Sequence, residues 1–155
     1  MTPRITTTCF AFVIEGRQYA LPLETVDEAL PMVWVTRVAE SPEDVCGVLD
    51  VRGTTVTVVD VALRLGAPVR EATPADFLVL VHSRSGRLAL RVDALVGLVD
   101  GALEPPPANA EGPSYVAGLL RNGAGLVTVL ALDDFLRPEV RAFAQRLRDE
   151  GRPAR

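Results

Sequence analysis

Lysine is absent from this chain of 155 residues, whose 16 basic side chains are all arginines. Without lysine the chain cannot use a Schiff-base nucleophile, a phosphate-loop lysine or a Ser–Lys catalytic pair. Histidine occurs once, at His82, so a single chain cannot supply the two or three histidines of a common zinc site. These two absences exclude several classes of enzyme and metalloprotein before any pattern is considered.

Cysteine and aromatic residues are also scarce. The two cysteines, Cys9 and Cys46, lack metal-binding spacing and are expected to be reduced and buried. The low aromatic content of 5%, the net charge of −4 and the absence of lysine disfavour nucleic-acid binding. No apolar run reaches the ~20 residues of a membrane span, and no signal peptide is visible. The sequence therefore predicts a soluble, cytoplasmic protein without membrane insertion.

What the sequence does contain is a series of short strand patterns. Residues 7–22 predict a hairpin with its turn at Glu15–Gly16, and further hairpins are expected around Arg52–Gly53 and residues 84–86. The apolar run at 32–39 (MVWVTRVA) is strand-like. The C-terminal part is different, because Val140, Phe143 and Leu147 recur at helical spacing after Pro138.

The two halves of the chain resemble each other. ALPLETV at 20–26 parallels ALRVDAL at 89–95, and CGVLDVRGTTVTVV at 46–59 parallels AGLLRNGAGLVTVL at 117–130. Both matches are separated by about 70 residues, which is too long for a solenoid unit and suits a duplicated small barrel. Two such barrels would leave a groove between them.

Few side chains suggest chemistry. Adjacent carboxylates such as Asp27–Glu28 point to opposite faces of a strand, so a solvated surface role is expected. His82 is expected to be exposed at a strand end, and Asp60 to cap the helical turn that follows it. Arg52 is the exception, because a guanidinium held on a rigid hairpin turn is suited to pairing with a partner's carboxylate.

Several motifs in order resemble those of the CheW family of chemotaxis coupling proteins. The strongest is GVLDVRGTTVTVVDVALRLG at 47–66, preceded by YALPLETVDE at 19–28, then VTRV, and Ser–Pro at 41–42. EPPP and VAGLL follow in the second half. The resemblance extends from Phe12 to Phe135, which is most of the chain.

The resemblance implies a mainly β fold of two SH3-like five-stranded barrels around a groove, with a C-terminal helix. The expected CheW-like domain covers residues 6–137, with lobe one at about 16–72 and lobe two at about 76–137. Exchange of strands between the lobes is left open. Residues 138–155 are expected to form the helix and a frayed tail.

The resemblance also implies a non-catalytic adaptor without cofactor or metal. Family members join the cytoplasmic tips of methyl-accepting chemoreceptors to the regulatory domain of a CheA-type histidine kinase, in membrane-associated or cytoplasmic arrays. The positions carried over as partner-binding residues lie on the expected strands around the Arg52 loop, with Thr36 and Arg37 on the neighbouring strand. They are Val26, Glu28, Thr36, Arg37, Asp50, Arg52 and Gly53.

Two departures from the family pattern keep alternatives open. Asp50 replaces an asparagine of the family loop and is expected to be able to pair internally with Arg52. Ala131 stands where an aspartate is common. One alternative is therefore a CheW-like scaffold in a gliding, polarity or other sensory pathway that binds receptor but not kinase. Another is an unrelated small-barrel protein, a nucleic-acid binder or a minor enzyme, which the low pI and the few aromatics disfavour.

Overall fold

The computed structural model describes residues 5–106, 114–123 and 125–150. The Pro-rich run that begins with EPPP at 104–107 continues beyond the described residues, and the expected frayed tail at 151–155 lies wholly outside them. The described strands are β1 (Ile5–Ile14), β2 (Arg17–Pro22), β3 (Val26–Pro31), β4 (Val45–Val51), β5 (Thr54–Asp60), β6 (Phe77–Ser83), β7 (Gly86–Val92), β8 (Ala94–Glu104), β9 (Val116–Asn122) and β10 (Gly125–Leu130). The helices are a 3-10 turn (Leu23–Thr25), α1 (Val61–Arg64), α2 (Leu132–Phe135) and α3 (Pro138–Glu150).

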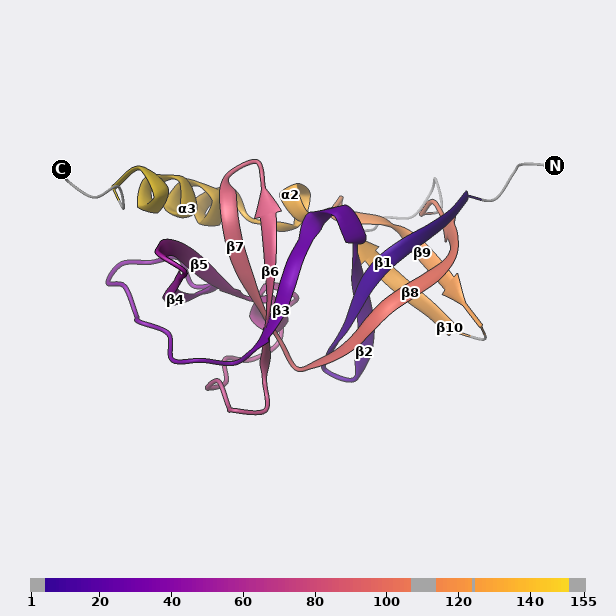
Figure 1. Cartoon of the computed structure of the whole chain (residues 1–155), viewed down its shortest axis with the longest axis horizontal. Helices are drawn as coiled ribbons and strands as arrows, with labels where there is room; N and C mark the ends of the chain where they lie inside the picture. Colours follow the sequence, from indigo (N-terminus) through magenta and orange to yellow (C-terminus); the bar gives the residue numbers. More distant parts are fainter. Residues whose placement is uncertain (1–4, 107–113, 124, 151–155) are drawn as a thin grey trace.

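The ten described strands form two sheets that lie side by side, with α3 beside β5 and β7 (Figure 1). Strands β1-β2-β10-β9-β8 close into a barrel, here barrel A, and β3-β6-β7-β5-β4 form the second sheet, sheet B. The mainly β fold with a C-terminal helix is confirmed. Sheet B differs from the expected barrel in that its outer strands, β3 and β4, are not paired along their length.

The sheets do not follow the lobe boundaries expected at 16–72 and 76–137. Sheet B takes the continuous strands β3 to β7, whereas barrel A joins the first two strands of the chain to the last three. The reason is that β1 pairs on one side with β2 and on the other with β8. Long-range pairing, not proximity in sequence, therefore decides which strands share a sheet.

The internal repeat is confirmed by strand pairing. In barrel A, β10 pairs in parallel with β2 through Thr128 and Tyr19, and in sheet B, β5 pairs in parallel with β7 through Thr57 and Leu88. These two pairs occupy equivalent positions of the two repeats. Each repeat contributes two strands to one sheet and three to the other.

The three expected hairpins are all present. The turns at Glu15–Gly16 and Arg52–Gly53 have positive φ at both central residues, which is the type I′ geometry that matches strand twist. β6 and β7 form the third hairpin, as expected around residues 84–86. Helix α3 begins at Pro138, and it buries Val140 and Phe143 as its spacing predicted.

The expected strand at 32–39 is wrong. β3 ends at Pro31, and the next residues make one isolated bridge, in which Thr36 and Val48 exchange backbone hydrogen bonds of 2.9 and 2.7 Å. Met32 and Val35 pack against the interior of sheet B. Inward-facing residues three apart do not fit the alternation of a strand. The segment therefore lies along the gap between β3 and β4 and does not pair as a strand of sheet B.

The largest core cluster lies where the two sheets and the C-terminal helices meet. It contains Phe12 and Leu21 from barrel A, Val79 and Leu90 from sheet B, and Phe135 from α2. Two smaller clusters fill the interiors of barrel A and sheet B. The main core therefore holds the two sheets together as one unit.

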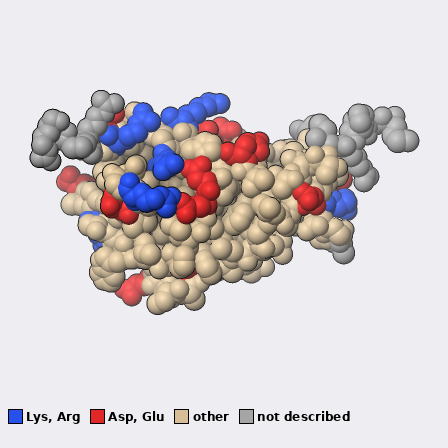
Figure 2. Space-filling model, in the orientation of Figure 1, with Lys and Arg blue, Asp and Glu red and all other residues tan. Residues whose placement is uncertain are grey.

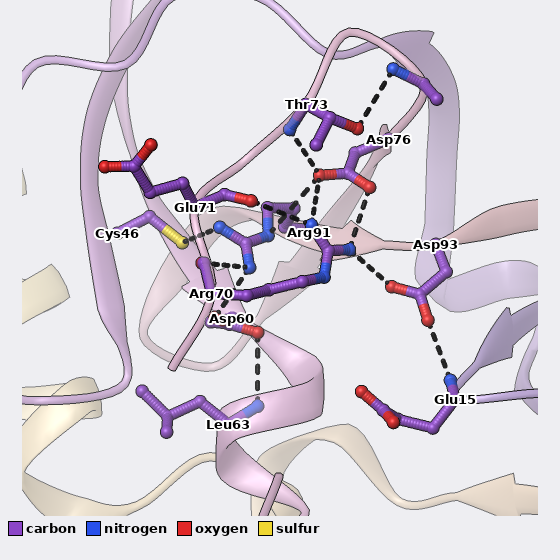
Figure 3. Close-up of polar contacts among 11 residues, drawn as sticks. Glu15, Cys46, Asp60, Leu63, Arg70, Glu71, Thr73, Asp76, Arg91 and Asp93 are labelled. Carbon is purple, nitrogen blue, oxygen red and sulfur yellow. Dashed lines mark hydrogen bonds and ion pairs between the residues drawn. The ribbon is translucent and has the colours of Figure 1, made fainter. Parts of the chain in front are cut away.

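A polar network also links the two sheets (Figure 3). Arg91 and Asp60 form a buried ion pair of 2.9 Å, with side chains only 6% and 8% exposed, and Asp60 also accepts from the Leu63 amide at the start of α1. The expected capping role of Asp60 is confirmed. Arg70 pairs with Asp93 at 2.7 Å, and Asp93 accepts from the backbone amide of Glu15 in the first hairpin of barrel A.

Asp76 completes this network. Burial opposes its ionisation, but hydrogen bonds from the Arg70 guanidinium and the Thr73 amide outweigh that cost and hold the pKa of the Asp76 carboxyl below its ordinary value of 3.8. Because this pKa is lowered in the folded protein, ionised Asp76 stabilises the fold above pH ~4, and that contribution is lost as pH falls further. Arg70 thereby fixes the loop between α1 and β6.

The bridge at Thr36 depends on a glycine. A Cβ atom at Gly47 would overlap the Thr36 carbonyl oxygen and lie 2.7 Å from Cγ1 of Val35. We expect Gly47→Ala to push this segment away from β4 and to lower the free energy of unfolding by about 1–3 kcal/mol. Urea denaturation measures the loss.

Gly125→Ala is the matched control, because a Cβ there would meet only the Asn122 carbonyl oxygen, at 3.8 Å. We expect this variant to unfold at nearly the wild-type urea concentration. Equal stability of the Gly47→Ala and Gly125→Ala proteins would contradict the close approach of the two segments.

Candidate partner-binding surface

The expected site residues gather where the two outer strands of sheet B approach each other. Two contacts cross this opening: the Thr36–Val48 backbone bridge, and an ion pair between Arg52 of the β4–β5 turn and Glu28 of β3. We call the surface formed by Glu28, Thr36, Arg37, Asp50, Arg52 and Gly53 the β3–β4 junction. It partly closes a sheet that regular strand pairing leaves open.

The turn at Arg52 and Gly53 presents its arginine to solvent. The Arg52 side chain is 67% exposed and that of Glu28 is 33% exposed, so the pair lies at the surface. A guanidinium carries five donors in a planar fork, and Glu28 is hydrogen-bonded through one terminal nitrogen. Arg52 can therefore accept a second carboxylate from a partner while Glu28 orients it.

Asp50 does not behave as expected. It is exposed on β4, and within the described residues the ion pair of Arg52 is with Glu28. The reason is geometric, because Glu28 on the opposite edge strand reaches the guanidinium. The carboxylate of Asp50 is left on the surface, where it adds negative charge to the junction.

The other carried-over residues have different positions. Val26 is half-buried, pairs with Val81 and packs against the main core, so it supports the junction from behind. Thr36 and Arg37 are exposed, but they lie in the irregular segment after β3 and not on a neighbouring strand. Gly53 has φ +85°, which favours glycine in the turn.

Trp34 is the residue that the sequence reasoning missed. Its side chain is 90% exposed, and the adjacent Val33 is also exposed. The sequence did contain a signal, because Trp34 is the single tryptophan and lies in an apolar run. Assigning that run to a strand does not show which side chains face the core and which face solvent. Tryptophan and arginine are the residue types most enriched among the side chains that dominate binding at protein interfaces, and both are exposed here, at Trp34 and Arg52.

The neighbouring carboxylates Asp27 and Glu28 act separately, as expected from a strand. Asp27 accepts a 2.9 Å hydrogen bond from His82 and lies 3.7 Å from Nε of Arg87, whereas Glu28 pairs with Arg52. His82 is exposed at its strand end, as predicted. The pair therefore does not form a two-carboxylate site for acid–base chemistry.

The described residues contain no group of three His, Cys, Asp or Glu side chains placed to hold a metal ion. Burial raises the pKa of the half-buried Cys46 thiol to about 11 and outweighs the lowering effect of the Arg91 charge, so the thiol stays protonated and a poor nucleophile. Among the helices in the described ranges, none combines the length and hydropathy needed to cross a bilayer.

Barrel A has a different surface. In Figure 2 charged side chains gather at the upper left, over sheet B and α3, while a broad uncharged area extends below and to the right. Exposed apolar side chains on barrel A include Val96 and Leu98 of β8 and Leu126 of β10. Exposed apolar side chains therefore occur on barrel A as well as at Val33 and Trp34, in the segment that follows β3 of sheet B.

The described fold is a pair of five-stranded sheets that share one core, with a C-terminal helix. The chain belongs to the CheW-like domain family, whose sequence model matches residues 8–139. It is similar to the chemotaxis protein CheW of Helicobacter pylori, with 24% identity over 83% of this chain and 80% of the relative. It is also similar to the chemotaxis protein CheW of Rhizobium meliloti, with 25% identity over 86% of this chain and 90% of the relative.

The fold is also found in a solved structure. The crystal structure of the scaffolding protein TtCheW from Thermoanaerobacter tengcongensis superposes with a TM-score of 0.74 at 22% identity. The match covers 81% of this chain and 89% of that protein. The resemblance inferred from the motifs is thus confirmed at the level of family and fold.

Proposed function

We propose that this protein is a non-catalytic adaptor that joins the cytoplasmic tips of methyl-accepting chemoreceptors to the regulatory domain of a CheA-type histidine kinase. Membership of the CheW-like family supports the proposal. The single observation that carries it is the exposed Glu28–Arg52 pair across the β3–β4 junction. The protein acts in the cytoplasm and is recruited to receptor arrays.

The geometry suits reversible assembly. Arg52 is held on a two-residue turn and oriented by Glu28, so little side-chain entropy is lost when a partner carboxylate binds. Each contact of this kind is individually weak, and repetition in an array supplies avidity. The adaptor affects kinase activity only if it binds one state of the kinase more tightly than another.

We expect Arg52→Ala to weaken partner binding by about 1–3 kcal/mol, because a charge-assisted contact is lost. The protein should stay folded, since the side chain is largely exposed. Titration calorimetry with the kinase regulatory domain, and separately with a receptor tip fragment, measures the change.

Arg17→Ala is the matched control, because Arg17 is an exposed arginine directly after a turn of the same type in barrel A. It should bind both partners as the wild type does. Unchanged affinity of Arg52→Ala for both partners would contradict the assignment of the junction.

Affinity capture from source-cell lysate, run with wild type and Arg52→Glu, tests the wider proposal. Recovery of a histidine kinase together with chemoreceptors, reduced by the substitution, supports the adaptor function. Recovery of receptors without a kinase would replace it with a scaffold of a gliding, polarity or other sensory pathway. Recovery of neither would contradict it.

A further inference from the structure

A polar cavity of about 260 Å³ lies between sheet B and the last turns of α3. Parallel pairing of β5 with β7 begins at Thr57 and Leu88, so the strands are unpaired before that point and leave a gap. The side chains that matter for its chemistry are Thr54, Thr55, His82, Ser85, Arg87 and Arg148. The cavity is thus a product of the strand arrangement and is covered on one side by the C-terminal helix.

The lining is basic and rich in hydroxyls. It contains two arginines and the single histidine, and no carboxylate among the described residues. A second cavity, of about 370 Å³, contrasts with it because four carboxylates, from Glu40, Glu43, Asp44 and Glu139, line it together with Arg137 and Arg146. Of these two cavities, the one beside β7 combines arginines with hydroxyl groups and has no carboxylate in its lining.

Arg148 is the side chain best placed to act on a ligand. Its Cδ and one terminal nitrogen would lie 3.3 and 3.4 Å from a Cβ built on Gly86, so the guanidinium rests over the β6–β7 turn. Within the described ranges Arg148 forms no ion pair. Its donors are therefore available to a group that enters the cavity.

Arg87 supplies the second guanidinium. Its one ion-pair contact with the described residues is the long 3.7 Å approach of Nε to Asp27, which leaves its terminal nitrogens free of ion pairs. The Asp27 carboxylate lies outside the cavity lining and is hydrogen-bonded to His82. It lowers the net positive charge of the site without occupying it.

We propose that this cavity binds a phosphate group, either inorganic phosphate or a small phosphate monoester. Two guanidinium forks and several hydroxyls match the oxygens of a phosphate dianion, which arginine binds in bidentate fashion. The volume is below the ~300 Å³ at which sites for drug-sized ligands begin, so it suits a small anion. A bound phosphate would link α3 to β7 through Arg148 and Arg87.

Inorganic phosphate and phenyl phosphate are the probes, each titrated into the full-length protein at constant ionic strength, with chloride as the balancing ion. Amide NMR spectra should show saturable shifts at Gly86 and Ser85 and none at Gly97 of barrel A. Tighter binding of phenyl phosphate identifies a monoester as the ligand, and tighter binding of inorganic phosphate identifies the free ion. Absence of saturable shifts with both probes overturns the proposal.

Arg148→Gln should weaken binding at least about tenfold, and Arg87→Gln should do the same. Arg146→Gln is the matched control, since Arg146 is an exposed arginine of the same helix that lines the acidic cavity. It should bind phosphate as the wild type does. Equal weakening by all three substitutions would show a non-specific charge effect and overturn the proposal, whatever the outcome for receptor and kinase binding.

Discussion

Asp60→Ala is expected to lower the free energy of unfolding by about 3–5 kcal/mol, the cost of leaving one partner of a buried ion pair uncompensated. Asp60 and Arg91 are both nearly inaccessible, and the 2.9 Å contact joins the end of β5 to β7. The substitution also removes the acceptor of the Leu63 amide at the start of α1. Urea denaturation followed by circular dichroism measures the loss.

Two further variants test whether the loss comes from the buried ion pair and not from removal of any carboxylate. Asp50→Ala, at an exposed position of β4, should change stability by no more than about 0.5 kcal/mol. Asp60→Leu combined with Arg91→Met removes both charges and should recover most of the stability lost in either single variant. A double variant less stable than both singles would show that the charges are not coupled as described.

Phe135→Ala should cost about 3–5 kcal/mol, because it removes a fully buried aromatic ring from the cluster that joins the two sheets. The ring contacts Tyr115 edge-to-face with centroids 5.3 Å apart. Arg64 lies over both rings, and its Nε donates a 2.6 Å hydrogen bond to the Phe135 carbonyl. Thermal and urea unfolding should both report the loss.

Phe10→Ala is the comparison, since Phe10 is half-buried and packs only at the edge of the same cluster. It removes the same side chain with less buried surface, so a clearly smaller loss is expected. Similar losses in the two variants would argue against the central position of Phe135.

Much of the local structure could be predicted because its signals lie close together in the sequence. The hairpin at Arg52–Gly53, the cap at Asp60 and the start of α3 at Pro138 each depend on neighbouring residues. The repeat was visible because equivalent strands keep similar apolar patterns. Family motifs then indicated the residues of the Arg52 loop.

What could not be predicted depends on contacts between distant segments. Nothing near Arg52 in the sequence indicates that Glu28 and not Asp50 is its partner, since the pairing arises where β3 and β4 approach each other. The same holds for residues 32–39. Their apolar run does not show that Met32 and Val35 pack against sheet B while Trp34 is exposed to solvent. Assignment of strands to the two sheets likewise required the three-dimensional pairing.

The division of strands between the sheets has a consequence for synthesis on the ribosome. β3 to β7 can pair as soon as residues 26–92 have emerged, whereas β2 finds its partner β10 only after Gly125. At ordinary translation rates of ~5–20 residues per second, the first hairpin waits roughly 5–20 seconds with open edges. During that interval neighbouring nascent chains on one messenger can exchange these strands, so slower elongation beyond β7 should raise the yield of intertwined dimers.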